Sequence, residues 1–444
     1  MRKGILFGVV LVLLQVPLLA LTLIQSDVFG GANHDSARRV AFAPDGGVYV
    51  AGTTVSADGD TNAFLRKYDA NRVVQWEHAY GLPFDSINGF DDDFTEGLAV
   101  GPDGSAHIAG MLGTGVLFLA KFDALGNLAW DSTYGENATI ASGAAVGPDG
   151  HIYVSAHFGG VNTGDPAHLE SRLLKFDSSG NLIWARAWGG IGEPGVPGFD
   201  QSHGVATSAD GVFMVGETNN FFANDAYLVK FDFDGNLLWQ RDWGVDGVQA
   251  PFTGLTVAFG VTTDAEGNAY FTGNTSDSGH SKNIVLVKFS GTGDLLWSKV
   301  GGPGFGTGRD VAVSPDGAAV FVSGNILADD PDFFGGFAFI AEFTSAGKAK
   351  KANTWGSSPE FSASAESVVV SGGGLVVTAG FVGPGPYEFG RESNSARNAD
   401  THLIIPNGVV QILPAVLAAQ DGQVLFFDSA TLGGNDAFTL WTQR

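Results

Sequence analysis

The sequence predicts an all-β fold, a seven-bladed β-propeller with four-stranded blades. Three observations predict it. A tight-turn motif, an aromatic residue and Asp followed by Gly-Asn, an apolar pair and Trp, recurs every 54 to 58 residues. A second turn, Pro-Asp-Gly or a variant, separates two apolar runs in each repeat. Neither motif lies in helical periodicity, and repeats of this length are typical of propeller blades.

Each repeat begins with a predicted hairpin of two apolar strands. Asp-Gly between β-rich runs is a strong hairpin signal, because Gly supplies the positive φ that the turn needs. The seven first strands are centred near Val40, Leu98, Ala144, Val205, Val261, Val311 and Val368. Their turns contain Asp45, Asp103, Asp149, Asp210, Glu266 and Asp316, and a run of glycines at 372–374 in the last repeat.

A second predicted hairpin carries a repeated Lys before the turn and a repeated Trp after it. The lysines are Lys67, Lys121, Lys175, Lys230 and Lys288, and the tryptophans are Trp76, Trp130, Trp184, Trp239 and Trp297. The sixth copy has Glu342 and Lys351 in these two slots. One Trp per repeat favours packing between blades over a sugar-binding platform. The repeated Asp residues favour turn capping over calcium binding.

The last repeat predicts how the ring closes. It ends at residues 436–444 with its third strand and has no fourth. The segment from Leu23 to Gly31 ends in the aromatic-Gly pair that closes other repeats, yet no strand partner precedes it. We therefore expect this N-terminal strand to complete the C-terminal blade, which leaves no open edge between blades. Residues 21–444 then form a single propeller domain.

The seventh repeat is longer than the others by about 45 residues, judged against the ~54-residue period. The excess is an insertion at about residues 381–432, between the second and third strands of the blade. Residues 404–419 are predicted to form a short hairpin or a helix. Insertions in repeat proteins often carry the individual function, so this segment is a candidate working surface, with neutral drift of a long loop as the alternative.

The N-terminus resembles a secretory signal. Arg2 and Lys3 precede an apolar run from Ile5 to about Ile24. We expect residues 1–20 to be a signal peptide cleaved after Ala20, and the product to be secreted or displayed at the cell surface without a membrane span. Cleavage after Ser26 would cut into the closing strand, and an uncleaved single-pass anchor is the other alternative.

Composition excludes several functions. The formal charge is −24, from 23 basic and 47 acidic residues, which argues against a nucleic-acid partner because phosphate binding needs a basic surface. The chain has no cysteine, which excludes disulfides, cysteine nucleophiles and thiolate metal sites. We expect a monomer whose partner, where there is one, is a protein or a glycan.

The repeat is similar to the SBBP repeat, a bacterial and archaeal seven-bladed β-propeller family. The matching pattern is an apolar strand, Asp-Gly, Val-Tyr-Val-x-Gly, then Asp-Ala-Phe-Leu-x-Lys-Phe-Asp, x-x-Gly-Asn and Trp. Residues 35–81 and 202–244 fit it best. The resemblance implies a secreted or surface propeller, and it carries no defined activity because no catalytic set characterises the family.

One unrepeated position predicts a binding site. Because first strands line the central channel of a propeller, residues two positions before each should encircle one mouth of it. These rim residues are Arg38, Glu96, Ser142, His203, Phe259, Arg309 and Glu366. Arg38, Glu96, His203, Arg309 and Glu366 are the candidate ligand-binding residues, with a self-satisfied salt-bridge network as the alternative. Asp35, Asp93 and Asp200 lie three residues earlier and are candidates for the same rim.

An acidic cluster predicts a metal site in the link between the first two blades. Its residues are Asp85, Asp91, Asp92 and Asp93. Several carboxylates in one loop provide the oxygen ligands that calcium prefers, so calcium is the candidate cofactor. The alternative is a solvated acidic loop without a bound ion.

These observations favour a non-catalytic binding or scaffold module over an enzyme. No nucleophile elbow, P-loop or zinc-protease motif is present in the sequence. The alternative is a propeller enzyme of the lyase, glycoside hydrolase or quinoprotein type with its site at the channel mouth. A hydrolase of that kind would need two acids about 5–10 Å apart, and Glu96 and Glu366 are the two rim glutamates.

Overall fold

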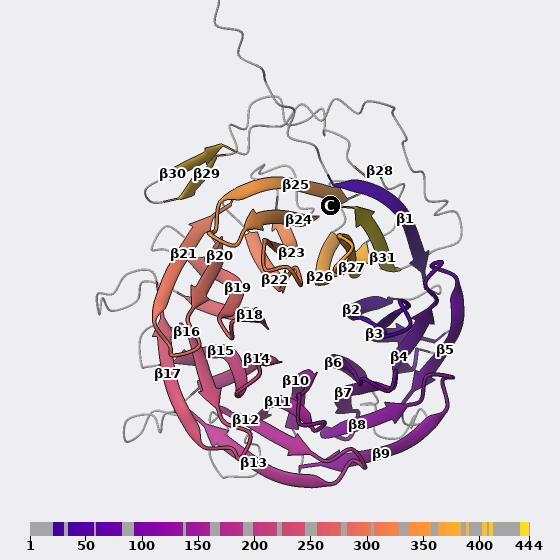
Figure 1. The fold of residues 1–444 in the computed structure, drawn as a ribbon. Coiled ribbons are helices and arrows are strands. Elements are labelled where there is room, and N and C mark those ends of the chain that lie inside the picture. The colour runs from indigo at the N-terminus through magenta and orange to yellow at the C-terminus, as the bar shows by residue number, and fades with distance from the viewer. Residues whose placement is uncertain are drawn as a thin grey trace, which may run out of the picture.

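The structure is a computed structural model, and its seven four-stranded antiparallel sheets stand around a central axis with their first strands innermost (Figure 1). It describes residues 21–30, 34–56, 59–81, 93–135, 139–159, 169–189, 199–219, 224–244, 255–276, 282–302, 306–327, 336–356, 363–382, 388–389, 402–405, 408–411 and 436–443. Among these residues there is no helix, and hence none with the length and apolarity that a membrane crossing requires. The prediction of an all-β, seven-bladed propeller is confirmed.

Blades 1 to 3 follow one another along the chain, and within each blade every strand pairs with the next. Blade 1 contains β2 (Ser36–Phe42), β3 (Val48–Val55), β4 (Thr61–Tyr68) and β5 (Val74–Tyr80). Blade 2 contains β6 (Phe94–Val100), β7 (Ala106–Leu112), β8 (Val116–Phe122) and β9 (Leu128–Tyr134). Blade 3 contains β10 (Thr139–Val146), β11 (Ile152–Gly159), β12 (Leu169–Phe176) and β13 (Leu182–Trp188).

Blades 4 to 6 repeat the same order. Blade 4 contains β14 (Phe199–Thr207), β15 (Val212–Asn219), β16 (Asn224–Phe231) and β17 (Leu237–Trp243). Blade 5 contains β18 (Thr256–Thr263), β19 (Ala269–Ser276), β20 (Lys282–Phe289) and β21 (Leu295–Gly301). Blade 6 contains β22 (Gly306–Val313), β23 (Ala319–Leu327), β24 (Gly336–Thr344) and β25 (Ala349–Gly356). A single parallel pair, Leu169 with Phe199, joins the sheets of blades 3 and 4.

Blade 7 is closed by the N-terminal strand, as predicted. It contains β26 (Ala363–Val370), β27 (Leu375–Val382), β31 (Asp436–Gln443) and, outermost, β1 (Thr22–Phe29). β1 runs antiparallel to β31 along its whole length. Side chains of both neighbouring blades hold it: Asn353 of blade 6 accepts a hydrogen bond from the Leu21 backbone N–H (3.1 Å), and Tyr68 of blade 1 donates one to Asp27 (2.6 Å).

Three short strands of the insertion lie between β27 and β31 in the chain. They are β28 (Glu388–Phe389), β29 (His402–Ile405) and β30 (Gly408–Gln411). β28 pairs with β25, the outer edge of blade 6, and the β29–β30 hairpin lies beside β21, the outer strand of blade 5 (Figure 1). The predicted hairpin or helix at 404–419 therefore begins within a hairpin, and residues 412–419 lie outside the described residues.

The repeated aspartates cap turns. In blade 4, Asp232 Oδ1 accepts hydrogen bonds from the backbone N–H groups of Asp234 (3.0 Å) and Asn236 (2.8 Å), and Oδ2 accepts from the Asn236 side chain (2.8 Å). Gly235 follows with a φ of 83°, which favours glycine. Asp123 and Asp177 make the same contacts. Both carboxylate oxygens are thus used by the turn, which confirms the turn prediction.

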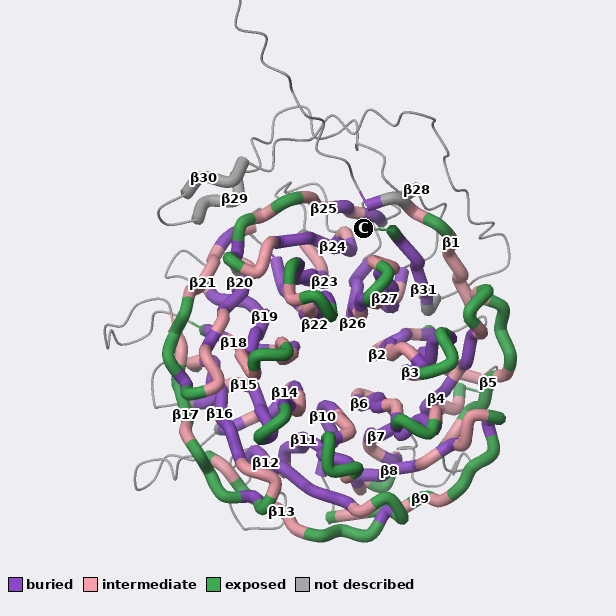
Figure 2. Tube along the Cα trace, viewed as in Figure 1, coloured by how far each residue is buried: buried purple, intermediate pink, exposed green. Residues whose placement is uncertain are grey.

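The repeated tryptophans pack between blades, as predicted. The indole N–H of Trp184 donates to the backbone carbonyl of Phe233 in the next blade (3.3 Å), and its ring covers Gly235 in that turn. Trp130, Trp239 and Trp297 donate to the following blade in the same way. Buried apolar side chains fill the space between successive sheets, where Figure 2 shows purple strands facing one another.

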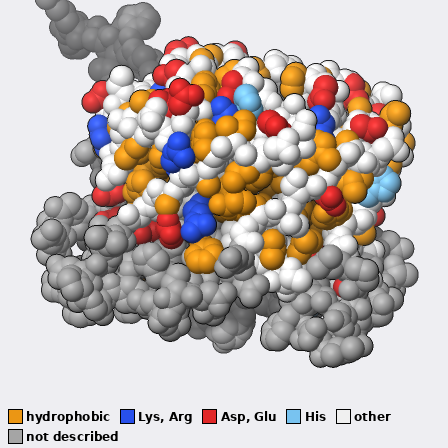
Figure 3. Space-filling model, turned by 90° about the horizontal axis from the view of Figure 1, so that it is seen from below, with side chains coloured by type: hydrophobic (Ala, Val, Ile, Leu, Met, Phe, Trp, Pro, Cys, Tyr) orange, Lys and Arg blue, Asp and Glu red, His pale blue; other side chains and the backbone are white. Residues whose placement is uncertain are grey.

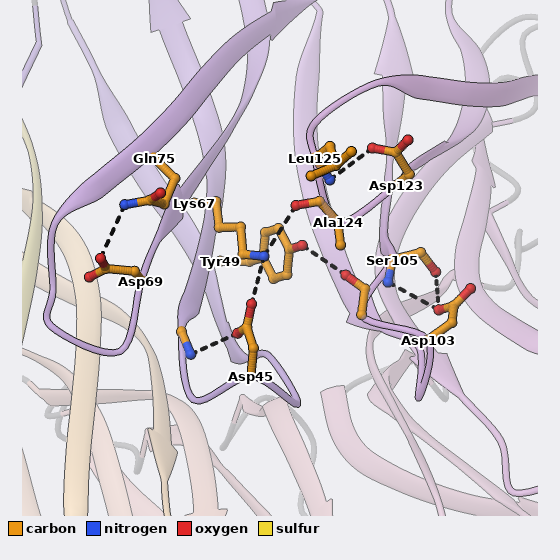
Figure 4. Close-up of polar contacts among 12 residues, drawn as sticks. Asp45, Tyr49, Lys67, Asp69, Gln75, Asp103, Ser105, Asp123, Ala124 and Leu125 are labelled. Atoms are coloured by element: carbon orange, nitrogen blue, oxygen red, sulfur yellow. Dashed lines mark hydrogen bonds and ion pairs between the residues drawn. The ribbon is translucent and has the colours of Figure 1, made fainter.

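Each repeated lysine ties its third strand to the turn of its first hairpin. Lys67 Nζ donates to Asp45 (2.9 Å) and to the backbone carbonyl of Ala124 in the next blade (3.2 Å; Figure 4). In blades 2 to 5 the partners are Asp103, Asp149, Asp210 and Asp264. In blade 5 the lysine thus pairs with Asp264, which is two residues before the Glu266 named from sequence.

Blade 6 has an acidic residue in the lysine slot and pairs it with lysines of its own fourth strand instead. Glu342, fully buried in the lysine slot, pairs with Lys350 (2.7 Å) and with Lys351 (3.5 Å) in the tryptophan slot. Lys351 is the direct cross-strand partner of Glu342, just as Trp239 is the partner of Lys230 in blade 4. The two departures from the repeat therefore compensate each other.

The outer wall of the ring is partly apolar. Fourth strands begin with aliphatic side chains that are about half exposed, among them Leu182, Leu237 and Leu295. Figure 3 shows hydrophobic side chains gathered across this wall. They belong to the apolar pair that precedes the Trp of each repeat, and the second residue of each pair is similarly exposed.

Candidate functional site

Every rim residue occupies a β-bulge in the innermost strand of its blade. In blade 1 the pairing of β2 with β3 shifts between Ala37 and Arg39, which leaves Arg38 as the extra residue. The same shift occurs around Glu96, Ser142, His203, Phe259, Arg309 and Glu366. A bulge re-aims side chains by breaking the strict alternation of a strand. The seven bulges thus present one unrepeated side chain per blade near the start of the first strands.

Four rim residues form a chain of ion pairs across blades 2, 1, 7 and 6. Arg38 Nε lies 3.5 Å from Glu96 Oε1, and Arg38 Nη1 donates to Glu366 Oε2 (3.3 Å). Arg309 Nε lies 3.7 Å from the other oxygen of Glu366. Ring closure makes this arc possible, because it brings blade 7 beside blade 1. The structure therefore brings together four of the five candidate ligand-binding residues.

Glu366 is the buried centre of this arc. Its side chain is only 5% exposed, whereas those of Arg38 and Arg309 are 34% and 35% exposed. Burial works to raise the pKa of Glu366, but the charges of Arg309 and Arg38 outweigh it and hold the pKa below its usual range. The charge of Glu96 raises the pKa of Arg38. Both directions favour the charged forms of Glu366 and Arg38.

Two residues that the sequence reasoning missed complete this side of the mouth. Arg39 of blade 1 donates to the backbone carbonyl of Ser142 in blade 3 (3.2 Å), so its side chain reaches past blade 2. Asp310, next to Arg309, accepts hydrogen bonds from the Ser367 hydroxyl (2.8 Å) and the Val368 N–H (3.0 Å), and burial raises its pKa. The available signal was a charged residue directly after a rim residue in an otherwise apolar strand.

The opposite side of the rim is aromatic. The Phe259 ring lies between Arg309, whose guanidinium carbon is 5.0 Å from the ring centroid, and His203, whose ring centroid is 4.9 Å away. His203 Nε2 lies 3.5 Å from Glu217 Oε1, so the fifth candidate residue joins the rim through Phe259 rather than through the ion pairs. These contacts place an aromatic ring next to the charged side of the mouth.

Polar residues of blades 3 and 4 contact one another close to His203. Gln201 contacts His157 Nε2 (3.2 Å), and burial, assisted by the nearby His203, lowers the pKa of His157 to about 4. The Ser142 hydroxyl contacts that of Ser202 in the next blade (3.0 Å) and joins blades 3 and 4. These contacts fix the bulges of the two blades against each other.

The entry aspartates serve the strands. Asp35, Asp93 and Asp200 are each at most 2% exposed. Asp35 accepts hydrogen bonds from Thr54 (2.5 Å) and from the Val55 N–H (3.3 Å), and Asp93 accepts one from the Gly113 N–H (2.7 Å). The contacts of Asp35 and Asp93 thus include the second strand of their blade or the turn after it.

The acidic loop lies largely outside the described residues. Of its four members only Asp93 is described, and Asp85, Asp91 and Asp92 are not. Among the described residues no group of three or more acidic or histidine side chains is arranged to hold a metal ion. The calcium site therefore stays a prediction.

Comparison with known proteins finds similarity of shape alone. No family model and no curated protein matches the sequence. A chain of the crystal structure of the mitotic checkpoint complex has a TM-score of 0.48 at 10% identity, covering 80% of this chain and 88% of that one. The β-propeller domain of the trilobed protease from Pyrococcus furiosus, which has an open velcro topology, gives 0.42 at 11% identity, covering 78% and 91%. The strand pairing itself identifies the chain as a seven-bladed β-propeller.

Proposed function

We propose that this protein is a non-catalytic binding or scaffold propeller of the SBBP-repeat type that works through its channel mouth. Residues 1–20 act as a signal peptide, and the propeller is secreted or held at the cell surface. Its partner is a protein, a glycan or a smaller ligand. Calcium in the acidic loop remains part of this proposal as a candidate cofactor.

The main support for the proposal is that repeated and unrepeated residues have different positions in the structure. The repeated Lys, Asp and Trp side chains are used inside the fold, in the Lys67–Asp45 pair, the Asp232 turn and the Trp184 contact. The bulges present side chains that differ from blade to blade. Positions that vary within a regular array are where individual function resides.

The state of the rim glutamates favours binding over hydrolysis. A general acid needs a pKa raised towards neutrality so that it carries a proton to donate. The pKa of Glu366 is instead lowered by Arg309 and Arg38, and Glu96 faces the same Arg38. Two carboxylates that contact the same arginine suit recognition better than acid–base chemistry.

A thermal-shift screen tests the proposal. The purified protein is melted with calcium, EDTA, sugars and quinone cofactors, because a ligand of the native state raises Tm. We expect a stabilising ligand whose shift disappears in the Arg38→Ala, Arg309→Ala double variant. Arg172→Ala is the matched control, since Arg172 is 25% exposed, lies 3.6 Å from Glu170 and stacks on Phe158 away from the channel. An unchanged shift in the double variant would refute a role for the rim.

A further inference from the structure

Two arginines of the rim contact the two oxygens of one buried carboxylate at rather long distances. Arg38 and Arg309 lie 3.3 Å and 3.7 Å from the two oxygens of Glu366. Arg38 Nε and Arg309 Nε are buried and have no hydrogen-bond partner. A guanidinium group prefers short, bidentate contacts with a carboxylate. The pairs here are longer and leave donor capacity unused.

Glu96 is the exchangeable member of the arc. Its side chain is 27% exposed, compared with 5% for Glu366, and it lies 3.5 Å from Arg38. A partly exposed ion pair at this separation contributes little to stability. An external carboxylate can therefore replace Glu96 at Arg38, while Glu366 stays in place between its two arginines.

The mouth gathers charged groups of both signs. The chain carries a formal charge of −24, but Arg38, Arg39 and Arg309 all gather here. Three carboxyl groups face them, those of Glu96, Glu366 and Asp310, and Arg39 interacts electrostatically with both Glu366 and Asp310. Displacement of Glu96 would leave three guanidinium groups facing two carboxyl groups, so an acidic ligand that takes its place restores the balance of charge.

We propose, building on the binding function above, that the channel mouth binds a small ligand bearing carboxylate groups. Arg38 and Arg309 are the binding residues, and Glu96 is the internal group that the ligand displaces. Because both arginines contact one carboxyl group, they lie close enough together for a short dicarboxylate to reach both. Phe259, stacked against Arg309, supplies an apolar wall for the carbon skeleton of the ligand.

Isothermal titration at low ionic strength tests this with succinate as the probe and succinamide as its neutral analogue. We expect succinate to bind at least about tenfold more tightly than succinamide, which is about 1.4 kcal/mol. The Arg38→Gln, Arg309→Gln double variant should weaken succinate binding at least roughly tenfold. Gln is chosen because its amide can still donate to Glu366. Arg172→Gln, the control, should leave the affinity unchanged.

Glu96→Gln gives a second readout that misfolding cannot imitate. Removing the internal competitor should tighten succinate binding by roughly two- to fivefold, since an ion pair of this kind is worth up to about 1 kcal/mol. A fall in affinity with added salt is expected in wild type because the contact is ionic and partly exposed. Unchanged or weaker binding in Glu96→Gln would contradict the displacement of Glu96.

The outcomes separate this inference from the proposed function. Absence of succinate binding to the wild-type protein, equal binding of succinamide, or equal binding of inorganic sulfate would overturn the carboxylate assignment. A different ligand whose thermal shift still depends on Arg38 and Arg309 would then keep the rim as the binding surface. A short glutamate-containing peptide that binds where succinate binds would indicate that the carboxylate comes from a protein side chain.

Discussion

Replacing His107 by tyrosine should make the protein more resistant to acid. His107 is 3% exposed and occupies the second-strand position opposite the repeated lysine. Five other blades place an aromatic ring at the equivalent position: Tyr49, Tyr153, Phe213 and Tyr270 lie opposite a lysine, and Phe321 lies opposite Glu342. The slot therefore accommodates tyrosine, and blade 2 alone among these six places an ionisable imidazole in it.

The size of this effect follows from the difference between the pKa values of His107 in the folded and the unfolded protein. Burial, assisted by the charge of Lys121, lowers the pKa of His107 to about 4, against roughly 6.5 in the unfolded chain. Between these values the unfolded state binds the proton and the folded state does not, so stability falls as pH falls. This residue alone should reduce the free energy of unfolding by about 2 kcal/mol at pH 5 and about 3 kcal/mol at pH 4, relative to pH 7.

Urea unfolding at pH 7, 5 and 4, followed by tryptophan fluorescence, measures this difference. Trp130 lies 5.9 Å from the His107 ring and provides a local signal. Between pH 7 and pH 4, the free energy of unfolding of His107→Tyr should fall by about 3 kcal/mol less than that of the wild type. His107→Phe should do the same, which separates the lost imidazole from the gained hydroxyl. Parallel pH profiles for wild type and both variants would refute the argument.

Two further predictions concern the blade interfaces and ring closure. Gly180→Ala should destabilise the protein by about 2–4 kcal/mol in urea unfolding, because the residue has a φ of 83° and a Cβ atom would lie 2.6 Å from Trp130. Gly150→Ala is the control, because Gly150 has a φ of 77° but no atom within 4 Å of an added Cβ. It should destabilise the protein by only about 1 kcal/mol. Equal destabilisation by the two substitutions would contradict the steric argument. Asp27→Asn should weaken the hold of Tyr68 on the closing strand and cost about 1–2 kcal/mol, with increased proteolysis near the N-terminus as the second measurement.

The sequence predicts the ring well because the repeat fixes the strands and their turns. Counting blades and finding residues 23–31 without a partner was enough to predict the closing strand β1. The position of the rim also follows from counting along the first strands. Ring closure makes blades 7 and 1 neighbours, so the sequence places Glu366 and Arg38 in adjacent blades. Their ion pair depends on long-range geometry, which no local motif predicts.

The bulges explain why Arg39 and Asp310 were missed. In a regular strand, successive side chains face opposite sides, so a residue next to a rim residue is expected to turn into the blade. A bulge inserts one extra residue and breaks this alternation, and Arg38 and Arg39 then both make contacts at the mouth. No turn residue or glycine in the sequence marks these bulges consistently. The strand periodicity alone therefore underestimated how many charged groups gather there.

The same bulges allow the residues of the binding surface to vary independently of the residues that hold the blades together. The extra residue in each first strand lies outside the ladder of cross-strand partners, so its side chain can change without disturbing the Lys67–Asp45 or Trp184–Phe233 contacts. Glu366 is the exception, because it is buried and its loss would leave two arginines without a shared partner. Substitutions at Glu96 should therefore change ligand affinity with little effect on stability, whereas substitutions at Glu366 should change both stability and affinity. An array of nearly identical blades can in this way acquire a specific site from single residues, without a new domain or a new loop.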